Sequence, residues 1–79
     1  MKTYKVFYSG TVERHQGISE EVKANSKREA VEKVYRMFFD TDYFPQDDGT
    51  ILNDAGNVIA NATDETIEMD GGLLIAEEI

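Results

Sequence analysis

Apolar and polar residues alternate along the first 24 residues in the pattern of a β-hairpin with one buried face. The apolar side chains occupy even positions on both sides of a turn at residues 14–17: Tyr4, Val6, Tyr8, Val12, Ile18, Val22 and Ala24. Polar side chains fill most of the odd positions between them. A period of two places alternate side chains on opposite faces of a strand, so the pattern predicts an N-terminal pair of strands.

The period changes to that of a helix after residue 25. Ser26 and Glu29 have the spacing of a capping box, in which each side chain satisfies a backbone N–H at the start of a helix. Downstream, apolar residues recur three and four positions apart, at Val31, Val34, Tyr35 and Phe38. One face of this helix is therefore expected to cover the sheet.

The remaining residues alternate between turn formers and short apolar runs. Residues 40–49 contain the single Pro and are expected to form a loop. A second hairpin is predicted over residues 51–59, and residues 66–76 are expected to form a third hairpin or a closing strand pair. Residues 63–66 are also compatible with a single helical turn. The layout is ββα followed by β-hairpins. It predicts one α+β domain over residues 1–79, with an antiparallel sheet of four to five strands and one helix on one face.

Composition narrows the class of protein. The chain has no Cys, which excludes disulfides, thiolate metal sites and cysteine nucleophiles and gives no sign of an oxidising compartment. No apolar stretch approaches the roughly 20 residues that a membrane-spanning helix needs, and the first ten residues lack the unbroken apolar core of a signal peptide. We therefore expect a cytoplasmic protein with no membrane partner.

Charge is distributed very unevenly along the chain. All eight Lys and Arg residues lie at or before Arg36, where five Glu residues leave a local balance of +3. Residues 37–79 hold eleven carboxylates and no Lys or Arg, so this part stands at −11. Uncompensated acid repels nucleic acid and attracts basic protein surfaces. We therefore expect a basic protein surface as partner and no direct binding of nucleic acid.

The residue types that support catalysis or metal binding do not form a recognisable motif. Asp48-Gly49 resembles the middle of an EF-hand loop, but in that register Ala55 replaces the bidentate Glu. His15 is the only imidazole and is expected to be an exposed turn residue. We expect no catalytic residue, no metal site, no cofactor and no enzymatic activity.

The candidate partner-binding residues are the acids downstream of the helix together with two aromatic residues among them. Tyr43 and Phe44 are possible apolar anchors, because an aromatic side chain surrounded by charge is typical of a protein interface. Glu68 and Asp70 share one strand face at about twice the ~3.4 Å rise per residue, and charges at this interval are compatible with mimicry of nucleic-acid phosphates, which recur every ~3.4 Å along the helix axis. The alternative is that the acids only keep a small domain soluble. The candidates are Asp40, Asp42, Tyr43, Phe44, Asp47, Asp48, Asp54, Asp64, Glu65, Glu68 and Asp70.

In its shortness, acidity, lack of Cys and predicted single helix on an antiparallel sheet, the chain resembles small phage-encoded inhibitors of the anti-CRISPR type. Those proteins share no diagnostic motif, so the resemblance rests on size, charge and layout over the whole chain. It implies a non-enzymatic inhibitor that acts as a nucleic-acid mimic on a CRISPR effector complex and blocks DNA recruitment. The basic N-terminal third departs from a pure mimic.

Other interpretations stay open at this point. One is a binder of divalent ions, because neighbouring carboxylates within residues 40–54 are compatible with weak divalent-cation binding even though the EF-hand register fails. The chain is also compatible with a small structural or adaptor protein that acts through an exposed sheet edge. A homodimer is a further expectation, since the +3 and −11 parts of two copies attract one another.

Overall fold

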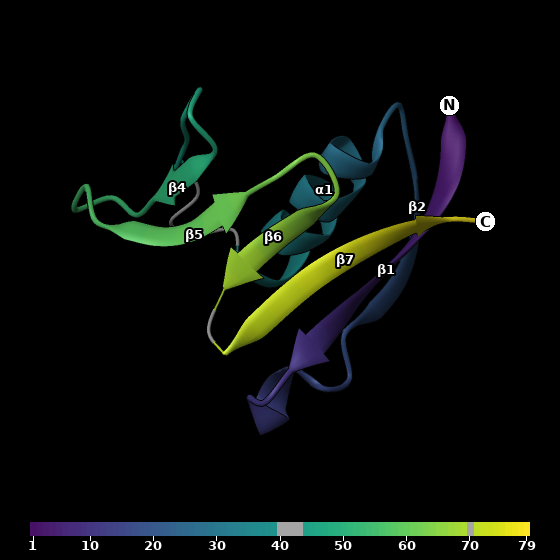
Figure 1. Cartoon of the computed structure of the whole chain (residues 1–79), viewed down its shortest axis with the longest axis horizontal. Coiled ribbons are helices and arrows are strands. Elements are labelled where there is room, and N and C mark those ends of the chain that lie inside the picture. The colour runs from purple at the N-terminus through teal and green to yellow at the C-terminus, as the bar shows by residue number, and fades with distance from the viewer. Residues whose placement is uncertain (40–43, 70) are drawn as a thin grey trace.

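The computed structural model of the chain describes residues 1–39, 44–69 and 71–79. Strands make up most of the regular secondary structure of these residues, beside one α-helix (Figure 1). In chain order the elements are β1 (Lys2–Gly10), the 3-10 turn η1 (Glu13–His15), β2 (Ser19–Ala24), α1 (Lys27–Phe39), β3 (Phe44–Pro45), β4 (Thr50–Leu52), β5 (Val58–Ala62), β6 (Thr66–Met69) and β7 (Gly72–Glu78).

The strands form one antiparallel sheet in the order β2-β1-β7-β6-β5-β4-β3. The sheet curls as a half-barrel beside the helix (Figure 1). The prediction of four to five strands was wrong, because the described part of the chain forms a sheet of seven. The strand that the sequence pattern does not indicate is β3, which has two residues, too few to show an alternation. Pro45 is tolerated because β3 lies at the sheet edge.

The three predicted hairpins are present as β1 with β2, β4 with β5, and β6 with β7. The pairing that the sequence pattern did not specify is that of β1 with β7, which joins the two ends of the chain along seven residue pairs, from Tyr4↔Glu78 to Gly10↔Gly72. Because this pairing puts the last strand between the first strand and β6, the N-terminal hairpin becomes part of the same sheet as the C-terminal strands.

One face of the sheet and one face of the helix enclose the core. The even positions of β1 face the helix, as the alternation predicted, and β7 contributes Leu74 and Ala76 opposite them. α1 buries Ala30, Val31, Val34 and Tyr35 against this layer. The largest side chains with almost no exposure come from both layers and are Ile51, Ile67, Leu74, Val6, Val31 and Val34.

The helix begins at the predicted cap. The Glu29 N–H donates to Ser26 Oγ at 3.1 Å, which satisfies one of the free amides of the first turn. On the outer surface of the helix, Glu29 Oε1 lies 3.7 Å from Lys33 Nζ. The same ammonium donates to the Lys23 carbonyl at 2.6 Å, so it links the helix to strand β2.

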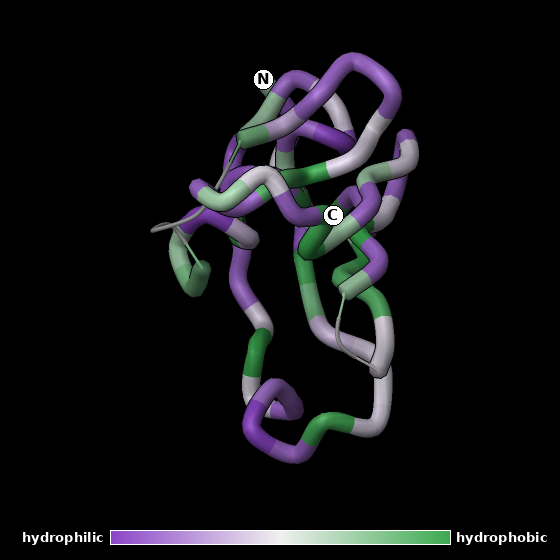
Figure 2. The backbone as a smooth tube through the Cα atoms, turned by 90° about the vertical axis from the view of Figure 1, so that its left-hand side faces the viewer, coloured by the Kyte–Doolittle hydropathy of each residue, from purple (hydrophilic) through white to green (hydrophobic). Residues whose placement is uncertain are grey.

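His15, in the turn between β1 and β2, is not exposed as the sequence predicted. The η1 turn forms the hydrophilic tip of the molecule at the lower end of Figure 2. Nevertheless, the His15 side chain is only 5% exposed and packs edge-on against Tyr8 and Phe39, with ring centroids 5.2 Å and 5.3 Å away. The expectation of an exposed turn histidine was wrong because α1 ends above this turn and its last residue, Phe39, covers the ring.

Candidate functional site

The turn between β3 and β4 holds two exposed carboxylates, Asp47 and Asp48. Asp48 Oδ1 accepts hydrogen bonds from the Thr50 hydroxyl at 2.7 Å and from the Thr50 N–H at 3.0 Å. The hydroxyl contact first, and then the N–H contact, lowers the pKa of Asp48 from its usual value of 3.8. The local sequence thus closes a tight turn and keeps this carboxylate ionised.

Gly49 holds the β3–β4 turn against the end of β5. Its φ of 95° is a conformation that glycine adopts without a steric penalty. The Ala62 N–H donates to the Gly49 carbonyl at 2.6 Å. This contact brings the end of β5 next to the β3–β4 turn. Exposed Asp64, two residues further on, therefore lies at the same end of the sheet as Asp47 and Asp48.

The β4–β5 turn places Asp54 at the other end of the same hairpin. Asn53 Oδ1 accepts from the N–H groups of Ala55 at 3.0 Å and Asn57 at 2.9 Å, and Gly56 has a positive φ of 83°. These contacts form an Asx-type turn. Asp54 takes no part in them and is exposed.

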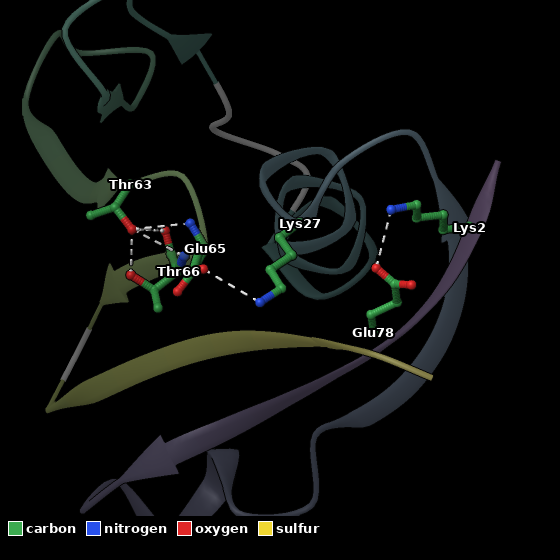
Figure 3. A network of polar contacts seen from close by, with 6 residues as sticks. All are labelled: Lys2, Lys27, Thr63, Glu65, Thr66 and Glu78. Carbon is green, nitrogen blue, oxygen red and sulfur yellow. Dashed lines mark hydrogen bonds and ion pairs between the residues drawn. The ribbon is translucent and has the colours of Figure 1, made fainter.

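The β5–β6 turn carries Glu65, whose charge is compensated. Thr63 Oγ1 accepts from the Thr66 N–H at 3.1 Å and the Glu65 N–H at 3.3 Å, which holds the turn without a helical segment. Glu65 Oε1 lies 3.3 Å from Lys27 Nζ at the start of α1 (Figure 3). A second ion pair joins Lys2 to Glu78 at 3.3 Å. The basic N-terminal third thus neutralises part of the acidic remainder.

An apolar row crosses β3, β4 and β5 on the face of the sheet that is turned away from the helix. Phe44 pairs with Leu52, and Leu52 pairs with Val58. Phe44 and Leu52 are directly opposite in a regular antiparallel pair and so lie on the same face, and the register shift between Ile51 and Leu52 brings Val58 opposite Leu52. Phe44 is 50% exposed and Val58 is 56% exposed, although both are large apolar residues.

The predicted partner-binding residues are therefore spread over several places. Asp47, Asp48 and Asp64 lie at one end of the β4–β5 hairpin, and Asp54 lies at the other end. Glu68 is exposed in the middle of β6, on the face turned away from the helix, since Ile67 beside it is buried. Glu65 is paired with Lys27. The predictions for Asp40, Asp42, Tyr43 and Asp70 lie outside the described residues.

Sequence reasoning missed two features of this region. The first is the contribution of Leu52 and Val58 to a surface row with Phe44, which depends on strand β3 and on the register shift between Ile51 and Leu52. The second is Lys27, whose pairing with Glu65 spans 38 residues. The spacing of Phe44, Leu52 and Val58 along the chain gives no periodic signal, because each residue comes from a different strand.

Other site chemistry can be judged only over residues 1–39, 44–69 and 71–79. Within these ranges no group of three or more His, Cys, Asp or Glu side chains is arranged to hold a metal ion. No helix in the same ranges has the length and apolar character needed to cross a bilayer.

Comparison of the chain with protein-family models, curated proteins and solved structures finds no match.

Proposed function

We propose that this protein is a non-enzymatic inhibitor that binds a basic protein surface and keeps nucleic acid from it. The binding region is the acidic lobe, defined here as described residues 44–69, which comprise β3 to β6 and their turns. It holds six carboxylates and no Lys or Arg: Asp47, Asp48, Asp54, Asp64, Glu65 and Glu68. In Figure 1 the β4–β5 hairpin of this lobe extends to the side opposite both chain ends.

The observation that carries the proposal is the exposed apolar row among these carboxylates, of which only Glu65 makes an ion pair within the described residues. Phe44 and Val58, each about half exposed, lie beside Leu52 on the outer face of the lobe. Interfaces gain most of their affinity from a few buried aromatic or aliphatic anchors, whereas surrounding charges mainly raise the association rate. The acidic lobe combines both features in one hairpin and a short edge strand.

The spread of acids over both ends of the hairpin favours a particular mode of binding. A flat negative face would suit a flat basic surface, but these charges lie at the two ends of a narrow hairpin. A groove with basic walls accommodates such a hairpin, because its two ends meet the walls while the apolar row contacts the floor. Grooves of this kind normally hold nucleic acid, because their basic side chains neutralise its phosphates.

Within this proposal the partner is a CRISPR effector complex in the cytoplasm of a host cell, and the protein is phage-encoded. The support is the resemblance in size, charge and lack of Cys to inhibitors of that type.

The test is a pull-down from host lysate followed by a displacement assay. The immobilised protein should retain a nucleic-acid-binding complex at low salt and release most of it at high salt. The added protein should then displace a labelled oligonucleotide from that complex. Replacing Asp47, Asp54 and Asp64 together by Asn should weaken binding at least about tenfold, and Phe44→Ser with Val58→Ser should mainly speed dissociation.

A matched control removes the same number of charges elsewhere. Glu13, Glu77 and Glu78 are exposed and lie outside the acidic lobe, so their joint replacement by Gln should leave binding within about threefold of the wild type. Equal loss of binding in both triple variants would show that only net charge matters. A captured complex that still binds its oligonucleotide would contradict the inhibitory mechanism.

A further inference from the structure

Strand β2 forms the edge of the sheet opposite the acidic lobe. It pairs with β1 on one side and with no other strand among the described residues. The Ile18 carbonyl accepts from the Tyr8 N–H, so the main-chain groups of even residues point toward β1. In an antiparallel ladder the alternate residues point the other way. The N–H and C=O groups of Ser19, Glu21 and Lys23 therefore point out from the edge.

The outward groups belong to a strand whose sequence, Ser-Glu-Glu-Val-Lys-Ala, is complementary to itself in one register. A two-fold axis perpendicular to the sheet makes an antiparallel pair of identical strands and places one residue opposite its own copy. An axis at Glu20, Glu21 or Lys23 would place like charges directly opposite each other, which is destabilising. An axis at Val22 places valine opposite valine instead.

The register centred on Val22 also creates favourable pairs. It places Glu21 opposite the partner's Lys23, and the partner's Glu21 opposite Lys23, while Glu20 lies opposite the partner's Ala24. Each Glu21 and Lys23 pair has its outward N–H and C=O groups aligned, so the two residues exchange two main-chain hydrogen bonds. The Lys23 carbonyl already accepts from Lys33 Nζ, and a carbonyl has a second lone pair for the new bond.

The neighbouring strands extend this charge complementarity. On the face turned away from the helix, Lys5 lies opposite Glu77 of β7 on one side and opposite Glu21 of β2 on the other. The charges in this row of side chains, from Glu77 through Lys5 to Glu21, therefore alternate negative, positive and negative. The partner's Lys23 would continue it with a positive charge. Glu21 and Lys23 are both exposed in the single chain, so no side chain has to move out of the core.

We propose that two copies of this chain pair along β2, in the register centred on Val22, to form one continuous sheet with both helices on the same face. This inference is independent of the proposed function, because β2 and β3 are opposite edges of the sheet. The dimer would leave an acidic lobe free at each outer end. An inhibitor built in this way presents two equivalent lobes to its partner, and linked lobes can bind more tightly than one.

Cysteine cross-linking tests the register directly, since the chain has no native Cys. Val22 and its copy form a non-hydrogen-bonded pair, for which the Cα separation is about 4.5 Å, within the ~4.4–6.8 Å range of disulfides. Val22→Cys should therefore form a covalent dimer under mild oxidation. Glu20→Cys is the matched control: its copy lies four residues along the strand, roughly 13 Å away, so it should stay monomeric. Cross-linking of both variants or of neither would overturn the register.

Charge reversal tests the interface without a covalent bond. Sedimentation of the full chain should show a monomer–dimer equilibrium, and Lys23→Glu should weaken dimerisation about tenfold, since it makes two repulsive pairs from two attractive ones. The double variant Glu21→Lys with Lys23→Glu restores opposite charges and should regain most of the affinity. A wild-type chain that remains monomeric at high concentration would overturn the proposal, and so would a dimer that Lys23→Glu leaves unchanged. Because the acidic lobe is intact in these variants, binding to a basic partner by single lobes would persist in either case.

Discussion

Lys27 Nζ lies 3.3 Å from Glu65 Oε1, so the first turn of the helix is joined to the turn that precedes β6. Because of this contact, the separation of charge along the sequence is only partly kept in the fold. Along the chain, positive and negative residues are almost fully separated. In the fold, Lys27 and Lys2 reach carboxylates of the acidic part. Asp47, Asp48 and Asp54, in the turns that flank β4, make no such ion pair among the described residues.

The Lys27–Glu65 pair should add little to stability. Both side chains are partly exposed, at 37% and 65%, and ion pairs of this kind contribute about 0.2–1 kcal/mol. A double-mutant cycle with Lys27→Ala and Glu65→Ala, measured by urea unfolding, should give a coupling free energy in this range that falls as salt is added. A coupling of several kcal/mol would mean that the pair is far more sheltered from water than its exposure indicates.

The Nε2 atom of His15 is buried and has no hydrogen-bond partner among residues 1–39, 44–69 and 71–79. An unsatisfied polar atom in the interior costs about 1–3 kcal/mol. The two rings that contact His15, Tyr8 and Phe39, favour an aromatic neighbour at edge-on geometry. We therefore expect His15→Phe to raise the melting temperature by about 4–8 °C, the change that ~1 kcal/mol produces in a domain of this size.

A second substitution separates polarity from ring packing. His15→Ala removes the unsatisfied atom but also the contacts with Tyr8 and Phe39, and it should lower the free energy of unfolding by about 2–4 kcal/mol. If both variants were less stable than the wild type, the imidazole would be making a contact that an apolar ring cannot replace. Scanning calorimetry of the three proteins decides between these results.

Asp48 should show the effect of its turn on proton binding. Its pKa is lowered by the Thr50 hydroxyl and N–H, so the folded protein binds this proton less readily than the unfolded chain. The resulting stabilisation is present above the usual value of 3.8 and is lost as pH falls through the lower pKa of the folded state. NMR titration should find Asp48 titrating below 3.8, and Thr50→Val should move it back toward that value. An unchanged titration in Thr50→Val would assign the shift to another cause.

The sequence predicts the local elements of this fold well, for physical reasons. Tyr4, Val6 and Tyr8 all face the helix because strand alternation depends only on neighbouring residues. The helix start at Ser26 is equally local, since its hydroxyl bonds the Glu29 N–H three residues away. Such contacts cost little chain entropy to form, so patterns of two to four residues specify them.

The parts that the sequence does not predict depend on distant contacts. Strand β3 exists because Phe44 and Pro45 pair with β4, and no two-residue pattern indicates a strand. His15 is buried because Phe39, 24 positions later, covers it. The candidate site combines both kinds of feature. Its acids could be listed from the sequence, but the row of Phe44, Leu52 and Val58 depends on a register shift between β4 and β5.

Gly49 provides the sharpest test of how the acidic lobe is built. A Cβ atom at this position would lie 2.5 Å from the Ala62 carbonyl oxygen, and the φ of 95° is unfavourable for any residue with a side chain. Since the clash is with backbone and not with a flexible side chain, β5 or the β3–β4 turn must move. We expect Gly49→Ala to lower the free energy of unfolding by more than about 2 kcal/mol, and to weaken the contact that holds Asp64 beside Asp47 and Asp48.

Substitutions at two other glycines separate the effect of the positive φ from the effect of the clash with Ala62. Gly56 also has a positive φ, of 83°, but a Cβ there meets nothing within 4 Å, so Gly56→Ala should cost only the backbone term of about 1 kcal/mol. Gly17 has neither constraint, and Gly17→Ala should be neutral or stabilising by up to ~1 kcal/mol, because it reduces the freedom of the unfolded chain. Urea unfolding of the three variants should rank Gly49→Ala as the most destabilised, Gly56→Ala next and Gly17→Ala least. If Gly49→Ala were no worse than Gly56→Ala, the close approach of Gly49 to β5 would not be what fixes the two turns together.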